Sequence, residues 1–143
     1  MFALVVWMLY TQRKALKQNQ GRIAALQDML KKQYANRVES IRVIVSAMLD
    51  QQCEYTEGCI RLKQLIEQVE PKLLEREDMA VIALMYSETE HMPIKEQWKE
   101  LEKKAKQKFT QQRLNLETKH QADIHAAVLS LKQHEFAGYQ NLG

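Results

Sequence analysis

Residues 37–53 decide the fold class of this chain, and they read RVESIRVIVSAMLDQQC. The stretch contains the β-branched run Val43-Ile44-Val45, but its apolar residues do not alternate with polar ones as they would in a half-buried strand. They recur instead at helical spacing and fall on one face of a helix: Val38, Ile41, Val45, Met48 and Leu49. The stretch therefore predicts an amphipathic helix.

The composition extends this prediction to the whole chain. Its 143 residues include only 4 Gly and 2 Pro, and residues that lose little rotamer freedom in a helix are abundant. Strand formers never gather in an alternating run bounded by turn residues. An apolar content of 45% excludes a wholly disordered chain, and the length suits one domain. We predict an all-α protein: a small bundle of four to five helices preceded by a long N-terminal membrane-proximal helix.

Residues 1–12 form an apolar N-terminal segment that begins MFALVVWMLY. A spanning helix needs roughly 20 apolar residues, so this run is about half of one. It also lacks the basic start and the small-residue cleavage site of a secretory signal. Three interpretations remain: part of a truncated membrane anchor, an interfacial anchor, or the start of a soluble helix that packs on the domain.

Aromatic and basic residues at the end of this run favour a membrane. Trp7 and Tyr10 are typical of an interfacial belt, and Arg13, Lys14 and Lys17 follow as a cytoplasmic flank. We therefore expect a bacterial inner-membrane protein, single-pass or peripheral, with its bulk in the cytoplasm. A soluble cytoplasmic protein is the alternative.

The remaining chain divides into a stalk, a domain and a tail. Residues 13–36 predict a polar helical stalk or a short self-association seam, because apolar residues repeat on one side: Leu16, Ile23, Leu26 and Leu30, with Asn19 and Gln33 at the other seam positions. Residues 37–137 predict the helical domain, and 138–143 a flexible tail. The helices of the domain are expected at 37–53, 57–69, 79–90 and 94–133. The last of them is one bent helix or a tight pair broken near Gln111-Gln112.

The net charge and the cysteines exclude few classes of function. The net charge of +3 is too small to indicate nucleic-acid binding. Residues 13–37 and 95–119 are locally basic and residues 50–90 are acidic, a pattern of solvated helix faces or of a surface that a partner binds. Cys53 and Cys59 make no disulfide framework, so free thiols in a reducing compartment are expected.

Metal and cofactor sites find little support in the motifs. Glu88 and His91, and Glu117 and His120, are two Glu-x-x-His pairs of the kind that build di-iron bundles. Too few residues separate them for the intervening helix that such a site needs. The two cysteines are also spaced more widely than the usual zinc pairs. We predict no metal, no cofactor and no assigned catalytic residue.

Two hypotheses of other classes stay open. Arg113 and His120, about two turns apart on a basic helix, resemble the active pair of some all-helical ribonuclease domains of toxin systems. A nuclease or another phosphate-acting enzyme is therefore one alternative. The other is a small-ligand sensor with a polar cleft near Arg61 and His91, for which the candidate residues are Glu57, Arg61, Tyr86, His91 and Trp98.

Two stretches carry a resemblance to a known family: residues 57–63, EGCIRLK, and residues 86–101, YSETEHMPIKEQWKEL. They resemble a bacterial, chiefly gammaproteobacterial, family of small helical proteins of unknown function, often with an apolar N-terminal segment. The resemblance covers roughly residues 35–135. It implies a small helical domain, fits a membrane-tethered cytoplasmic arrangement, and supplies no activity or catalytic residue.

These observations together favour a non-enzymatic protein-interaction module at the cytoplasmic face of the membrane. We expect a protein partner or self-association, and membrane contact through Met1–Tyr10. Nucleic acid is the less favoured partner. The sequence does not identify the partner or a small-molecule ligand.

Overall fold

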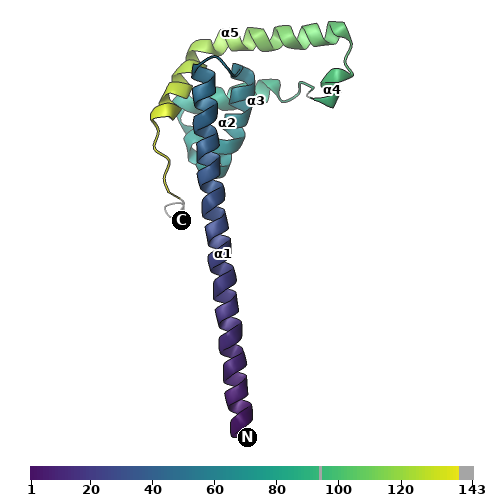
Figure 1. Cartoon of the computed structure of the whole chain (residues 1–143). Coiled ribbons are helices and arrows are strands. Elements are labelled where there is room, and N and C mark those ends of the chain that lie inside the picture. Colours follow the sequence, from purple (N-terminus) through teal and green to yellow (C-terminus); the bar gives the residue numbers. More distant parts are fainter. Residues whose placement is uncertain (94, 139–143) are drawn as a thin grey trace. The chain divides into compact units, whose positions relative to one another are not determined.

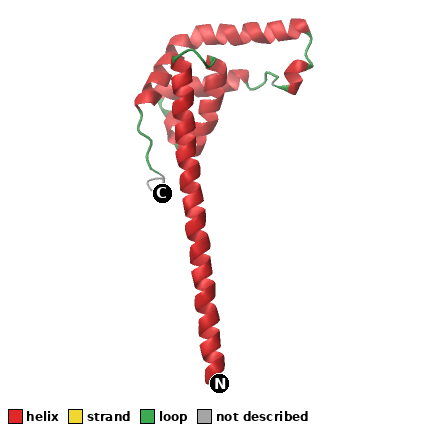
Figure 2. Cartoon of the chain, in the orientation of Figure 1, coloured by secondary structure: helices red, strands yellow, loops and turns green. Residues whose placement is uncertain are grey.

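The computed structural model describes residues 1–93 and 95–138, and this part of the chain contains helices and no strand (Figures 1 and 2). The prediction of an all-α fold is confirmed. Five α-helices and two short 3₁₀ helices follow one another in these residues: α1 Phe2–Leu49, α2 Tyr55–Val69, η1 Pro71–Glu75, η2 Glu77–Met79, α3 Ala80–Thr89, α4 Glu96–Lys99 and α5 Lys103–Gln133.

The chain divides into two compact units, the first from Met1 to Asn36 and the second from Arg37 onward. The first unit is helical from Phe2 to its end, and most of its side chains are exposed. The prediction that a separate helix begins at residue 37 is wrong, because α1 continues through Asn36 to Leu49. Gly21 is the only helix breaker in residues 2–49, and a single glycine costs a helix only about 1 kcal/mol.

The core of the second unit lies where α2 packs on α3 and on the last turns of α5. The last turns of α1 contribute the apolar face that the sequence predicted. The largest fully buried side chains of this core come from α1, α2, α3, α5 and η2. They are Ile41 and Met48, Leu62 and Ile66, Met79, Ile82 and Met85, and Ile124 and Leu131. Burial of such side chains is the main favourable term in folding, so this cluster holds the second unit together.

Gly58 marks the closest approach within this core. It is buried in the first turn of α2, and a methyl group built on its Cα would overlap the thioether of Met48, which is 1% exposed. The absence of a side chain at Gly58 therefore lets α2 lie directly against the end of α1.

The segment expected to be one long helix is interrupted near its start. Ile94 lies outside the described residues, α4 is a single turn, and the chain leaves helical geometry before α5 begins at Lys103. Of the two alternatives for the last segment, a break near Gln111-Gln112 is not found, because α5 runs through both residues and the Gln111 side-chain amide donates to Asn115 one turn later at 2.9 Å. Glutamine is a good helix former, which is consistent with an unbroken helix there.

Only the second half of α5 belongs to the core. Its buried residues are Ile124, Ala127, Val128 and Leu131, whereas Lys103–Lys108 is a largely exposed basic turn and a half. Figure 1 shows α4 and the first half of α5 extending away from α2 and α3.

Candidate functional site

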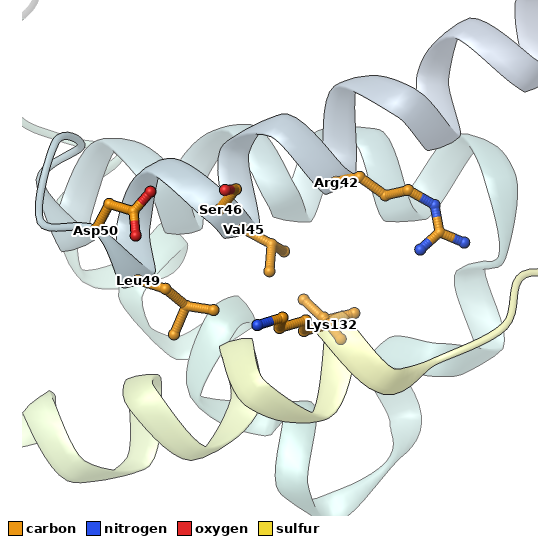
Figure 3. Close-up of a pocket in the computed structure, with 7 residues that line it drawn as sticks. Arg42, Val45, Ser46, Leu49, Asp50 and Lys132 are labelled. Atoms are coloured by element: carbon orange, nitrogen blue, oxygen red, sulfur yellow. The ribbon is translucent and has the colours of Figure 1, made fainter.

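A pocket of about 310 Å³ lies between the last turns of α1 and the end of α5, within the second unit (Figure 3). Its floor is apolar, since Val45 and Leu131 are 3% and 2% exposed. Polar side chains surround this floor: Arg42, Ser46, Asp50 and Lys132. The amphipathic spacing of α1 predicted the buried floor, but the sequence analysis did not predict the pocket, because α5 supplies its other wall from about 90 residues further along the chain.

The charges of this pocket are spread along it. Figure 3 shows the Arg42 guanidinium at one end, the Asp50 carboxylate at the other and Lys132 between them. Eight residues of helical rise separate positions 42 and 50, about 12 Å at 1.5 Å per residue. The charged groups therefore do not converge on one point, and apolar surface lies between them. We call this surface the α1–α5 pocket.

The structure places the predicted polar cleft residues in separate contacts. Glu57 and Arg61 form an ion pair at 2.7 Å one turn apart on α2, with both side chains more than half exposed. An exposed pair of this kind contributes only a few tenths of a kcal/mol. It is therefore no evidence for a ligand site.

The other cleft residues contact different partners. The Lys63 ammonium lies 4.1 Å from the centre of the Tyr86 ring, and the His91 ring lies 6.3 Å from that of Phe109 on α5. Trp98, on α4, is half-buried. Shared binding of a small ligand by these residues stays a prediction.

The pair Arg113 and His120 lies on the unbroken α5, seven residues apart and about 10 Å along the helix axis. The Arg113 guanidinium is already paired with the Glu54 carboxylate at 3.1 Å. That carboxylate offsets the charge that a phosphate would need, so the geometry does not favour the nuclease hypothesis.

Glu117 has a role that the sequence analysis missed. The amide N–H and the hydroxyl of Thr56 both donate to Glu117 Oε1, at 3.1 and 2.7 Å. The first turn of a helix leaves backbone N–H groups without partners, and here a carboxylate from α5 accepts from one of them. Among the described residues, no group of three potential ligands gathers in a geometry that would hold a metal ion.

Two further polar contacts fasten the end of α5 to the connection that follows α2. The Ser130 hydroxyl donates to Asp78 at 3.0 Å, and His134 Nε2 lies 2.7 Å from a carboxylate oxygen of Glu70. With the Thr56–Glu117 contact, these contacts hold α5 at Glu117, at Ser130 and at His134, which directly follows its last residue.

The two cysteines are free thiols near the start of α2. Burial, with a smaller contribution from the Glu117 charge, raises the pKa of Cys59 to about 12. Burial and the neighbouring Glu57 also raise the pKa of the half-buried Cys53. The thiolate is the reactive form, so both cysteines are poor nucleophiles at neutral pH.

The start of α1 carries an extended apolar surface. The first ten residues are all exposed, and the large side chains among them range from Leu9 at 51% to Phe2 at 87%, with Met1 fully exposed. Monomeric soluble proteins rarely expose contiguous apolar patches larger than a few hundred Å². Across residues 1–93 and 95–138, no helix has an apolar stretch long enough to cross a membrane.

Comparison with known proteins identifies the family. The sequence profile described as "Protein of unknown function (DUF2489)" matches residues 1–131. The chain belongs to this family. The match confirms the resemblance to a family of unknown function and extends it to Met1, upstream of the stretch from residue 35 on which the resemblance was noted. No curated protein and no solved structure matches the chain.

Proposed function

We propose that this protein is a non-enzymatic interaction module tethered by Met1–Tyr10 to the cytoplasmic face of the bacterial inner membrane. The exposed apolar start of α1 is the observation that carries the proposal. The family match is compatible with it and assigns no activity.

The distribution of apolar residues around the helix favours insertion over surface binding. Helical positions advance by 100° per residue, so the consecutive exposed side chains from Leu4 to Leu9 cover every side of the helix. A helix that lies flat in the interface is apolar on one face and charged on the other. An all-round apolar segment is instead favoured where hydrocarbon surrounds it on every side.

The length of the segment and its flank agree with this orientation. Ten helical residues extend about 15 Å, half of a hydrocarbon core of about 30 Å. Trp7 and Tyr10 then lie toward the headgroups, and Arg13, Lys14 and Lys17 lie among anionic lipids.

The α1–α5 pocket is the surface that we propose for a protein partner. Its apolar floor and separated rim charges resemble the apolar centre and polar rim of a protein interface. The pocket lies in the second unit, so a partner bound there is carried by the tethered chain.

Membrane fractionation of a C-terminally tagged chain with an alkaline carbonate wash tests the tether. We expect retention in the washed pellet, and loss of retention for Leu4→Lys, because a lysine within an inserted helix costs about 2.5–3.5 kcal/mol near the bilayer centre and less toward the interface. Gln18→Lys, an exposed position outside the segment, is the matched control and should behave as the unmodified chain. Release of the unmodified chain by carbonate would overturn the tether.

A pull-down from membrane extract tests the pocket. Arg42→Glu and Lys132→Glu should each remove a partner that the unmodified chain recovers, whereas Lys119→Glu, exposed on α5 outside the pocket lining, should not. Equal recovery by all four chains would place the interaction elsewhere.

A further inference from the structure

We infer that two copies of this chain pair through α1 as a parallel, in-register, two-stranded coiled coil. The inference deepens the proposed interaction role, on which it rests, by naming the partner of the first unit as a second copy. The unbroken course of α1 from Phe2 to Leu49 carries it.

Because α1 starts at Phe2, the seven-residue repeat is longer than the stalk alone indicated. The first seam position is apolar in five successive heptads: Phe2, Leu9, Leu16, Ile23 and Leu30. The second seam position is occupied by Val5, Gln12, Asn19, Leu26 and Gln33. The first seam position thus keeps an apolar repeat over five heptads, whereas the second is apolar only at Val5 and Leu26; apolar residues at both positions are the usual pattern of a coiled coil.

The seam is open in the single chain. Leu9, Leu16, Ile23 and Leu26 are 51 to 60% exposed, and Leu30 is half-buried. These side chains form a stripe along one side of the helix rather than scattered surface residues. In a coiled coil each seam side chain inserts between four residues of the facing helix, so the stripe on a second copy fits against this one.

Charge on the first unit does not oppose self-pairing, although residues 1–36 carry six basic residues and one acidic. Lys14, Lys17, Lys31 and Lys32 occupy heptad positions that face away from a partner. Arg13 and Arg22 flank the seam. In a parallel in-register pair Arg13 faces Met8 of the other copy and Arg22 faces its Gln27, so no like charges meet.

Asn19 favours the in-register arrangement. An amide in the seam is satisfied by a polar group on the other helix and is left without a partner by an apolar one. In a parallel in-register pair Asn19 faces Asn19, and Gln12 and Gln33 likewise face their own copies. A shift of one heptad sets Asn19 of one copy against Leu26 of the other. The parallel orientation also brings both apolar N-terminal segments to one membrane.

Disulfide trapping in the full chain tests the inference. Leu16→Cys and Leu26→Cys, each made with Cys53→Ser, should both form covalent dimers in most of the protein under mild oxidation at micromolar concentration. Cys59 stays in place because it is buried. Asp28→Cys, exposed on the outward face, is the matched control and should give few dimers.

Two trapping sites fix the orientation. Positions 16 and 26 are about 15 Å apart along the helix, so an antiparallel pair brings at most one of them opposite its own copy. Trapping at only one site, or trapping of Asp28→Cys to the same extent, would overturn the parallel seam.

Sedimentation equilibrium of the chain without engineered cysteines gives an independent readout. The unmodified chain and Gln18→Lys should be dimeric at tens of micromolar. Ile23→Lys should be monomeric, with unchanged helix content by circular dichroism because the position is exposed in the single chain. A monomeric unmodified chain would overturn the inference.

These measurements test the membrane tether and the dimer independently of each other. Leu4 lies on the outward face of the repeat, so Leu4→Lys should abolish membrane retention and leave the dimer. Ile23→Lys should do the reverse. A chain released by carbonate but still trapped at both sites would retain the coiled coil and lose the tether.

Discussion

Gly58 and Gly21 show how strongly the cost of a methyl group depends on its surroundings. A side chain at Gly58 meets the buried Met48, whereas one at Gly21 has nothing within 4 Å. Overpacking a core costs about 1–3 kcal/mol, and alanine in a helix gains about 1 kcal/mol over glycine. The difference of these terms is a net loss, and we expect Gly58→Ala to lower the free energy of unfolding by up to about 2 kcal/mol in urea titration.

Gly21→Ala is the internal control for that measurement. It should leave the unfolding of the domain unchanged and raise the thermal stability of α1 helicity slightly, since propensity alone acts there. A stabilised Gly58→Ala would mean that Met48 adopts another rotamer at no cost.

Cys59 makes the stability of the domain depend on alkaline pH. Folding raises the pKa of its thiol from 9.0 to about 12, so the native state favours the protonated form. The protonated thiol therefore contributes fully to the free energy of unfolding below pH 9. This contribution is lost as the pH rises toward 12, by at most ~1.4 kcal/mol per pH unit.

Urea unfolding between pH 7 and 11 checks this dependence. The unfolding free energy of the unmodified chain should fall more steeply above pH 9 than that of Cys59→Ala, which is less stable at pH 7 because of the cavity but lacks the titrating thiol. Parallel curves for the two chains would contradict the assigned cause.

At the scale of elements, Glu117 on α5 stabilises the start of α2. Its carboxylate accepts two hydrogen bonds from Thr56, and Glu54, the residue that precedes α2, forms no side-chain cap of its own. We expect Glu117→Ala to reduce the unfolding free energy by about 1–2 kcal/mol, the usual worth of a helix cap. Glu117→Gln keeps an acceptor oxygen and should lose less.

A double-mutant cycle with Thr56→Val isolates this contact. If the two side chains act through each other, the double variant should be more stable than the sum of the single effects predicts. Additive effects would show that Glu117 stabilises α5 in some other way.

At the scale of the whole molecule, the buried core lies almost entirely in the second unit. Apart from Tyr34, its apolar members run from Ile41 to Leu131. A chain that begins at Arg37 should therefore unfold cooperatively in urea with a midpoint near that of the full chain. Loss of a cooperative transition would show that the first unit is needed for folding.

A chain that begins at Lys31 is the control for that truncation, because it restores Tyr34 and one further turn of α1. If the chain that begins at Lys31 unfolds cooperatively and the chain that begins at Arg37 does not, the turn around Tyr34 belongs to the folding unit. In that case the domain boundary lies upstream of the predicted residue 37.

The sequence by itself determined the helical class and the apolar faces, because both depend on local propensity and on periodicity within a helix. The face of residues 37–53 and the apolar run at 79–86 became buried core. The helix boundaries were less determined. The predicted start of a helix at 37 was wrong, and the continuity of the helix at Gln111 was left open, since few strong local signals mark where a helix continues.

Only the tertiary structure decided which polar groups meet. Glu117 pairs with Thr56 across 61 residues, Arg113 with Glu54, and His134 with Glu70. The α1–α5 pocket has walls from segments that lie even further apart in the sequence. These contacts depend on how α5 packs against α1 and α2, and a one-dimensional pattern of residues carries no information on the packing of one helix face against another.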